Sequence, residues 1–366
     1  MRLARALIVL LVVAACDHPT PPEPGEYGPQ GPFSNAIPRQ LTFNTGQNLT
    51  PAWLPDGSGI IYQFERVDQV DGDRCLGILP AEGGRRAEIC NNTIAGADST
   101  DAYGDPAVSG AGRLFFSRAS DAWRLHNLAP ALMDVAVAPL ATPGLVQSVR
   151  TLPYTVGGRT HYGIAQTRWL GDSAVLYMAQ NVFYVRVVGY DTVRAGIELA
   201  LMDLKSAPGT VTTVPGTDSV TSVAVGAGDT IYYTVAGDSR VLRRTLATGD
   251  TATVWDFGAP AIARDVQVRG SKLLAVVGGV VTYAHDPSLG PVQSDKGGVV
   301  HAVDLLLAAD TTLAPAGRLY RHIALSPDGR RIVAEGYTFS VVVHIAPQPW
   351  DTIVSPHANL WLVDTP

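Results

Sequence analysis

The 366-residue chain is poor in charge, since only 16% of its residues are Asp, Glu, Lys or Arg and the net charge is −6. Nucleic acids and anionic lipid surfaces are bound through clustered Lys and Arg, so this balance argues against both as main partners. Motifs of common enzymes are also missing. The sequence has no Gly-x-Ser-x-Gly elbow, no phosphate-binding glycine loop and no His-Glu-x-x-His pair, and its eight His are dispersed. We therefore expect no catalytic residue, no metal and no cofactor.

One acidic segment faintly suggests a calcium loop. Asp68, Asp71 and Asp73 lie close together in residues 67–73, but their spacing misses the EF-hand pattern and the closing Glu is absent. A solvated loop is the favoured interpretation.

The chain begins with an apolar run that is too short to cross a bilayer. Ala6 to Val13 follow two basic residues, Arg2 and Arg5, and small residues then lead to Cys16. Val13-Ala14-Ala15-Cys16 resembles a bacterial lipobox, with Val in place of the usual Leu. The resemblance implies that residues 1–15 are a lipoprotein signal peptide and that Cys16 carries acyl chains such as palmitate, which together form a stable anchor. The alternative is an ordinary signal peptide in which Cys16 is incidental.

The next segment has a composition that prevents packing. Residues 16–35 contain six Pro and three Gly, so we expect an extended tether before a folded domain over residues 36–366. The protein is then exported and lipid-anchored to the cell membrane or the outer membrane. Its folded domain lies in the periplasm or at the cell surface.

A strand–turn–strand pattern recurs along the folded part. Residues 51–62 (PAWLPDGSGIIY) combine apolar strand residues with an Asp56-Gly57 turn, and residues 323–333 (IALSPDGRRIV) repeat the pattern around Asp328-Gly329. Turns at Gly110, Gly171, Gly228 and Gly270 mark four further repeats of some four short strands each. Repeated units of this kind predict an all-β repeat architecture. Within the second repeat, residues 123–140 fit a strand or a helix face equally well.

Leu41-Thr42, the 51–57 segment and Leu325-Ser326-Pro327-Asp328-Gly329 resemble the repeats of TolB-like propellers. The resemblance implies a six-bladed β-propeller and says little about function, because propellers host binding scaffolds and enzymes alike. The last repeat is one strand short, and the strand predicted at residues 37–43 stands alone. We expect these two to pair and close the ring. Seven blades are the alternative, since residues 141–166 have room for extra strands.

The connectivity predicts where a site lies. Tight turns fall on one face of the ring, and long excursions fall on the other, at residues 65–74, 91–104, 141–166, 181–196, 284–298 and 342–358. Aligning the turns places six polar residues at the channel mouth on the elaborated face, near the start of each innermost strand: Thr50, Asp105, Gln166, Thr221, Arg264 and His322. These residues either meet channel water or bind a peptide terminus or small polar ligand.

Two further features concern contacts. Phe183, Tyr184, Val187, Tyr190 and Trp350 form either a partner-binding patch or the packed side of a hairpin. A hairpin that turns at residues 81–84 would place Cys75 directly opposite Cys90, where a disulfide is possible in an exported protein. The alternative is two buried thiols.

Together these features predict a monomeric cell-envelope lipoprotein whose propeller is a scaffold for a protein partner or a small polar ligand. The alternatives are a propeller enzyme, a lyase or hydrolase acting at the channel mouth, and a structural lipoprotein without a ligand.

Overall fold

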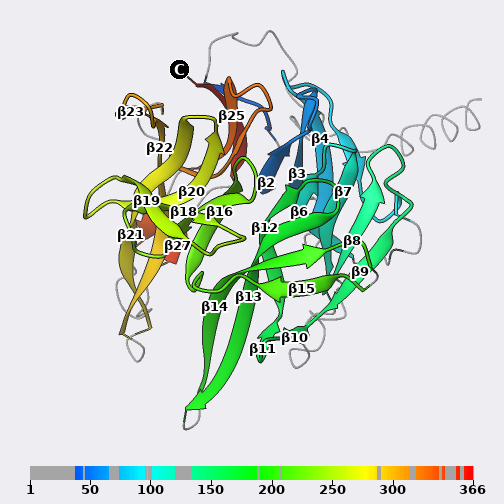
Figure 1. Cartoon of the computed structure of the whole chain (residues 1–366), viewed down its shortest axis with the longest axis horizontal. Coiled ribbons are helices and arrows are strands. Elements are labelled where there is room, and N and C mark those ends of the chain that lie inside the picture. The colour runs from blue at the N-terminus through cyan, green and yellow to red at the C-terminus, as the bar shows by residue number, and fades with distance from the viewer. Residues whose placement is uncertain are drawn as a thin grey trace, which may run out of the picture.

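The computed structural model describes residues 38–43, 46–65, 74–94, 97, 101–119, 133–187, 190–206, 208–286, 290–313, 319–337, 340–342, 352–354 and 358–365. Every regular element within these ranges is a β-strand and none is a helix, as expected for an all-β chain (Figure 1). The lipidation residue Cys16, the tether and the Asp68–Asp73 segment lie outside the described residues.

Four antiparallel sheets contain four strands each, and the strands lie side by side in sequence order. The first holds β2 (Asn48–Trp53), β3 (Gly59–Glu65), β4 (Arg74–Pro80) and β5 (Ala87–Ile89). The second holds β6 (Ala102–Val108), β7 (Arg113–Ala119), β8 (Met133–Pro139) and β9 (Gln147–Leu152). The third holds β12 (Gly163–Leu170), β13 (Ala174–Val187), β14 (Tyr190–Asp203) and β15 (Thr210–Thr213). The fourth holds β16 (Val220–Val225), β17 (Thr230–Val235), β18 (Arg240–Thr245) and β19 (Thr251–Asp256).

The remaining large sheet has eight strands and consists of two sets of four. One set is β20 (Ile262–Arg269), β21 (Lys272–Asp286), β22 (Gly290–Asp304) and β23 (Ala309–Thr312). The other is β24 (Leu319–Leu325), β25 (Arg331–Tyr337), β28 (Asn359–Asp364) and β1 (Arg39–Gln40). A single pair, Gly298 with Tyr320, joins the two sets. Two small hairpins complete the inventory: β10 (Tyr154–Val156) with β11 (Arg159–His161), and β26 (Ser340–Val342) with β27 (Thr352–Val354).

Among the described residues, the first strand, β1, pairs with the last, β28, as the sequence predicted. Arg39 lies opposite Leu362 and Gln40 opposite Trp361, and Leu41 N–H donates to the Leu360 carbonyl at 2.7 Å. Leu41 is 1% exposed and packs with Leu360 and Leu362 in one core cluster. The outer edge of β28 is therefore covered by the N-terminal segment.

Both Pro-Asp-Gly segments form the predicted tight turns. Gly57 and Gly329 each have a φ of 73°, a left-handed value that favours glycine, and each donates its N–H three residues back at 2.9 Å. The Asp56 carboxylate accepts the Ser58 N–H at 3.0 Å, which fixes the turn locally. The two turns also lie near each other, because Trp53 beside the first donates its indole N–H to Ala324 before the second, at 2.9 Å.

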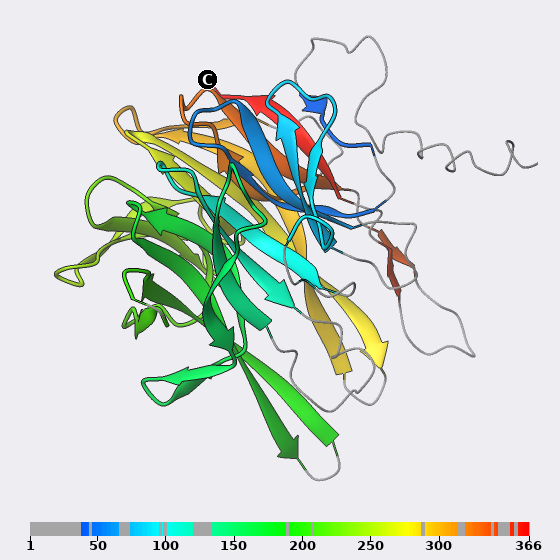
Figure 2. The ribbon, with the colours of Figure 1, turned by 90° about the vertical axis from the view of Figure 1, so that its right-hand side faces the viewer.

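The first strands of the six four-stranded sets touch one another in order. These strands are β2, β6, β12, β16, β20 and β24, each contacts the next, and β24 contacts β2. Apolar clusters fill the space between neighbouring sets; one joins Ile60 and Tyr62 of the first set to Val333 of the last. Figure 2 shows the sheets side by side with their long middle strands running in similar directions.

Two predicted loops are corrected by the structure, and two segments that the sequence left open are defined by it. Residues 181–196 and most of 284–298 are not loops, because β13–β14 and β21–β22 are long paired strands that project beyond their sheets (Figures 1 and 2). Residues 133–139 form a strand, which removes the helical alternative for that segment. Residues 141–166 do contain extra strands, but these are the fourth strand of the second sheet and the small β10–β11 hairpin.

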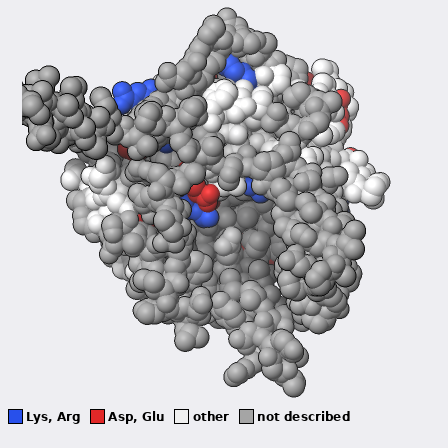
Figure 3. All heavy atoms as spheres, turned by 180° about the vertical axis from the view of Figure 1, so that it is seen from behind, with Lys and Arg blue, Asp and Glu red and all other residues white. Residues whose placement is uncertain are grey.

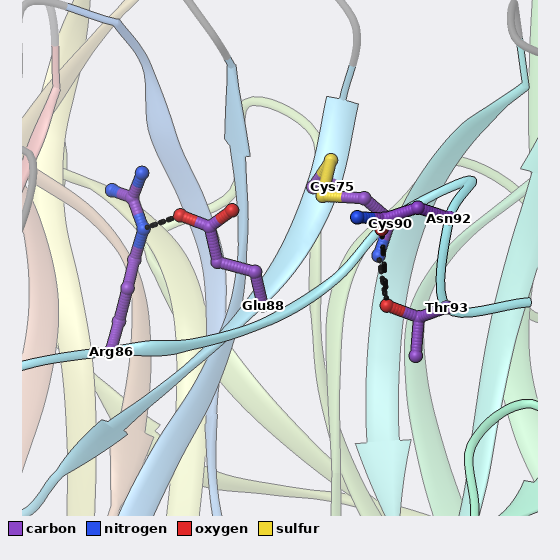
Figure 4. The surroundings of a disulfide bond; sticks show 6 residues. All are labelled: Cys75, Arg86, Glu88, Cys90, Asn92 and Thr93. Carbon is purple, nitrogen blue, oxygen red and sulfur yellow. Dashed lines mark hydrogen bonds and ion pairs between the residues drawn. A yellow bond between two sulfur atoms is a disulfide. The ribbon is translucent and has the colours of Figure 1, made fainter. Parts of the chain in front are cut away.

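The disulfide predicted from the hairpin register is present. Leu76 lies opposite Ile89, so Cys75 and Cys90 are the next facing pair, with Cα atoms 4.9 Å apart (Figure 4). Both cysteines are at most 5% exposed. The covalent bond joins β4 to the residue that follows β5, just beyond the last backbone pair of these two strands.

Candidate binding site

Each of the six innermost strands contains an irregularity at an equivalent place. The register with the second strand shifts around Thr50, Asp105, Gln166, Thr221, Asp265 and His322. Such a bulge adds one unpaired residue to one strand and turns its side chain in a new direction. Five of these residues have φ between 31° and 49°, unusual values for side chains other than glycine; Thr221 is the exception.

The bulges show that the alignment of turns from the sequence was wrong by one residue in the fifth set of strands. The sequence placed Arg264 at this position of the fifth set, whereas Arg264 pairs normally with Val276 and the bulged residue is Asp265. The other five predicted residues are all bulged. An alignment counted from turns cannot show which of two neighbouring residues carries the extra unpaired position.

Two small adjoining cavities lie among these residues. The first, about 20 Å³, is lined by Thr50, Asp105, Gln166, Arg168, Asp265 and His322, with their neighbours Pro51, Pro106, Thr167 and Ile323. The second, about 160 Å³, is lined by Gln166, Thr221, Arg264, Asp265, Arg321, His322 and Tyr337. All six residues predicted at the channel mouth therefore line one cavity or both.

Seven charged residues belong to this region, and we call them the mouth cluster: Asp105, Arg168, Arg264, Asp265, Arg321, His322 and Glu335. Space-filling views show acidic and basic side chains adjoining near the middle of one face of the molecule (Figure 3). Sequence analysis missed four of the seven. Arg168 and Asp265 lie within two residues of predicted positions, and Glu335 could have been noticed as the one acidic residue in a mostly apolar strand.

Glu335 is the buried anchor of the cluster. Its carboxylate is fully buried, accepts the Thr50 N–H, and binds His322 Nδ1 at 2.8 Å and Arg321 Nε at 2.9 Å. Burial alone would raise the pKa of Glu335, but the charge and hydrogen bond of His322, together with Arg321, hold it below its ordinary value. Burial alone would likewise lower the pKa of His322, yet the Glu335 carboxylate raises it to about 9. His322 is therefore a cation at neutral pH.

A second group of charges faces His322, in which Asp265 is buried and Asp105 and Arg168 are half-buried. Burial raises the pKa of Asp105 to about 6, against the attraction of His322 and Arg168. Burial also raises the pKa of Asp265 and lowers that of Arg168, whose charge is favoured by Asp265 and Asp105. Asp265 is 3% exposed and accepts the Ile323 N–H through Oδ2. Its Oδ1 atom, like Arg168 Nε, is buried without a hydrogen-bond partner among the described residues. Polar atoms in this state are uncommon in proteins and mark places where water or a ligand binds.

Long hairpins extend from the same end of the inner strands. β12 begins at Gly163 opposite Gln180, and β13 continues seven residues further to Val187, which is about 24 Å of strand. β21 similarly continues beyond the pair of Ile262 with Gly278. The face that carries the mouth cluster is therefore the elaborated one, as predicted. Trp350 of the predicted aromatic patch lies outside the described residues, as do the side chains of residues 183–190.

A larger cavity lies at the opposite end of these strands, on the face predicted to be plain. It measures about 380 Å³ and is lined by Trp53, Asp56, Gly57, Ala81, Ser326, Pro327, Asp328 and Arg331, from both Pro-Asp-Gly turns. Asp56 Oδ1 and Asp328 Oδ1 each accept hydrogen bonds from residues of their own turn. This cavity accordingly has fewer converging charges than the mouth cluster.

A separate buried network supports the third sheet. His161 is fully buried, with Nε2 at 2.8 Å from Glu198 and Nδ1 at 2.9 Å from the Tyr154 hydroxyl. That hydroxyl also meets Tyr177, and Arg159 binds Glu198 at 2.6 Å. No cavity described above touches His161, so the network fastens the β10–β11 hairpin to the sheet. Within the described part of the chain, no group of three or more His, Cys, Asp and Glu is placed to hold a metal.

No protein-family model matches this chain, and no curated protein matches it in sequence. Solved structures do match. Regucalcin, titled a calcium-binding protein, from Agrobacterium tumefaciens is 14% identical with a TM-score of 0.51, over 88% of this chain and 94% of that one. Puromycin hydrolase is 10% identical with a TM-score of 0.51, over 93% of this chain and 56% of its own. TolB from Acinetobacter baumannii is 15% identical with a TM-score of 0.48, over 89% of this chain and 65% of TolB.

These neighbours are β-propeller proteins, and at such identities the likeness shows the fold alone. The small antiparallel sheets described above are those of a β-propeller. Since the chain spans about two thirds of TolB and 56% of puromycin hydrolase, nothing about the whole proteins' activities or partners follows from the match.

Proposed function

We propose that the chain is a six-bladed β-propeller in which β1 completes the last blade. Three observations support the count: six innermost strands contact one another in a cycle, each has one bulge at an equivalent place, and β1 pairs with β28. Extra strands for a seventh blade are not available in residues 141–166, because β9 completes the second sheet and β10–β11 is a two-stranded hairpin.

We further propose that this propeller is a binding module in the cell envelope and that the mouth cluster is its ligand site. The observation that carries the proposal is the convergence of charged side chains from β6, β12, β20 and β24 on two adjoining cavities, with Glu335 of β25 bound to two of them. The projecting β13–β14 and β21–β22 hairpins surround the same end and offer further surface to a partner. Export and a lipid anchor at Cys16 are part of the proposal and rest on the lipobox-like sequence. No helix of the described residues is long and apolar enough to span a bilayer.

A second candidate is an enzyme of the hydrolase or lyase type. A pKa of about 6 at Asp105 and of about 9 at His322, on neighbouring groups beside a cavity, is an arrangement found in acid–base catalysis. Proteins of this fold include a hydrolase and a calcium-binding protein by their titles, so the fold does not choose between the two.

The test is to crosslink the lipidated protein in its native membrane and identify proteins that co-purify. A variant with Arg264→Ala and His322→Ala is treated in parallel, and Cys16→Ala should release the protein from the membrane fraction. A discrete partner that is lost in the double variant supports the binding module. No partner in either form contradicts a protein-binding scaffold and leads to a screen of substrates at the mouth cluster.

A further inference from the structure

The plain face of the molecule is built from the short connections at one end of the strands. In each of the six sets, the residue after the third strand donates its N–H to the connection between the first two strands; Leu140 donates to Gly112 and Leu305 to Ser271, both at 2.9 Å. Both kinds of connection therefore lie at the same end of every set. Apart from Ala207, these connections lie within the described residues, so the exposure of their side chains is defined.

Two of these connections expose leucines. Leu306 and Leu307, between β22 and β23, are 83% and 76% exposed, and Leu145, between β8 and β9, is 68% exposed. Neither connection, residues 140–146 or 305–308, contains a charged residue. Single exposed leucines are common on protein surfaces, but an adjacent pair at the tip of a hairpin is a small apolar patch directed into the solvent.

The backbone of the β22–β23 turn is suited to an apolar environment. Asp304 Oδ1 accepts the Leu306 N–H at 2.9 Å and the Leu307 N–H at 3.2 Å. With the Leu305 N–H bound to Ser271, all three successive leucine amides have partners inside the protein. A backbone N–H that leaves water without a partner is costly, so this turn can leave water at a lower cost than an open loop.

The N-terminal segment reaches the fold at the same face. Arg39 of β1 binds Glu82, in the connection between β4 and β5, at 2.5 Å. Residues 16–37, the expected tether, therefore join Cys16 to the plain face, and their number allows about 70 Å of extended chain. A tether of this length does not by itself determine which face meets a bilayer. The exposed leucines lie on the face where the chain enters, so the anchor and the leucines act on the same side.

The shape of the plain face favours a lipid bilayer over a protein. The leucines line none of the three cavities described above, whereas the apolar anchors of protein interfaces pack into pockets. In the cycle of inner strands, the second and fifth sets are three steps apart. The two leucine turns therefore lie on opposite sides of the face and can meet a flat surface together.

The charge of the plain face explains how such a contact would form. Its connections carry six acidic residues (Asp56, Glu82, Asp172, Asp229, Asp250 and Asp328) and four basic ones (Arg85, Arg86, Lys205 and Arg330). This balance gives no attraction to anionic lipids. Contact with a membrane then depends on the leucines entering the apolar part of the bilayer.

We propose that Leu145, Leu306 and Leu307 insert into the surface of the membrane to which Cys16 is anchored. The plain face then lies on the bilayer, and the mouth cluster, at the opposite end of the inner strands, points away from it toward the aqueous compartment. Three leucines bury less apolar surface than the acyl chains, so they orient a protein that the acyl chains already hold. This inference rests on the proposed function, because the bilayer is close only if Cys16 is acylated, and it specifies how the anchored domain is oriented.

The test attaches an environment-sensitive fluorophore to the leucine turn of the lipidated protein. Leu306→Cys supplies a single free thiol, because Cys75 and Cys90 form a disulfide and Cys16 is acylated. The labelled protein is reconstituted into phosphatidylcholine vesicles, and quenching by a spin label on the lipid acyl chains is measured. Leu145→Cys is labelled in the same way.

Phe43→Cys is the matched control. Phe43 is 38% exposed but lies toward the mouth end, beyond Thr42, which binds Asn359 at the start of β28. We expect quenching at positions 306 and 145 to be roughly threefold stronger than at position 43, and equally strong when the vesicles contain phosphatidylglycerol. Quenching at either leucine position that is no stronger than at 43, or that requires the anionic lipid, would overturn the inference.

A protein partner is the competing occupant of the leucine turn. A variant with Leu306→Ser and Leu307→Ser changes only exposed side chains, so it should fold and should keep the crosslinked partner of the proposed function. Loss of that partner would show that the turn binds protein and would overturn the inference. Mass spectrometry separates the two proposals. A chain without acyl groups on Cys16 refutes the anchor and this inference together, whereas an acylated chain with unquenched leucine turns refutes this inference alone.

Discussion

The replacement Glu335→Gln removes one buried negative charge and leaves the shape of the side chain nearly unchanged. The wild-type carboxylate is fully buried and is bound by the Thr50 N–H, His322 and Arg321, so it connects β25 to β2 and β24. The Gln amide still offers one acceptor, but its NH₂ group then faces donors that have lost their counter-charge. We expect the variant to be clearly less stable.

The magnitude follows from the exposure of the partners. Removing one member of a fully buried ion pair costs about 3–5 kcal/mol. The Arg321 and His322 side chains are 41% and 38% exposed, so water replaces part of the lost attraction. We therefore expect a loss near the lower limit, about 3 kcal/mol, or roughly 1 M in the midpoint of urea unfolding for a slope of about 3 kcal/mol/M.

Glu82→Gln is the matched control. Glu82 also pairs with two cations, Arg39 and Arg331, but is 61% exposed, so its removal should cost about 0.5 kcal/mol. The pKa of Glu335 is held below its ordinary value of 4.5, so its contribution is complete above pH 4.5 and is lost as the pH falls through the lowered pKa. The difference between wild type and Glu335→Gln should therefore shrink on acidification. A Glu335→Gln protein within about 0.5 kcal/mol of wild type, or no less stable than Glu82→Gln, would refute the argument.

Three further outcomes are expected from urea unfolding. Burial raises the pKa of Asp105 from 3.8 to about 6, so the native state loses stability as the pH rises from about 4 to 6. Asp105→Asn should restore up to about 3 kcal/mol of unfolding free energy at pH 7 but little below pH 4. A variant that is less stable than wild type at pH 7 would mean that Arg168 requires the Asp105 charge. Replacing Cys75 and Cys90 by Ala should cost about 3 kcal/mol, since the bridge spans 15 positions; wild type treated with reductant should behave alike, and an unchanged midpoint would contradict a stabilising bridge. Replacing His161 by Phe leaves the buried Glu198 short of a hydrogen bond and should cost about 3 kcal/mol, whereas a cost under about 1 kcal/mol would mean that water takes the place of the ring.

Local chemistry explains which parts of the fold could be predicted. The Asp56-Gly57 and Asp328-Gly329 turns depend on a left-handed glycine and a carboxylate that binds its own backbone, so neighbouring residues determine them. The facing of Cys75 and Cys90 follows from counting outward from the hairpin turn at residues 81–84. The long hairpins were harder to predict, because the alternation of residues 183–190 fits a β-hairpin and a partner-binding patch equally well and no Asp-Gly turn motif lies within them.

The sequence was sufficient to predict the position of the site on the inner strands, but not the charged residues that bind one another there. Position within a repeat gave five of the six bulged residues, since the repeats share one geometry. The anchoring carboxylate Glu335 comes from a second strand, and its partners Thr50 and His322 are 285 and 13 residues away in sequence. Pairings across such separations depend on the closure of the whole fold, which no local pattern contains.

The bulges of the inner strands have a consequence for how the protein can vary. Because the backbone itself leaves the ladder at Thr50, Asp105, Gln166 and His322, the direction of each side chain is imposed by the main chain and not by the chemistry of the side chain. Residues at the first three positions can therefore be exchanged while the framework stays the same, whereas His322 is also constrained by its bond to the buried Glu335. Asn or Gly, which tolerate positive φ, would even relieve local strain. Substitutions at the bulged positions could therefore change which ligand is bound while the backbone of the inner strands is kept.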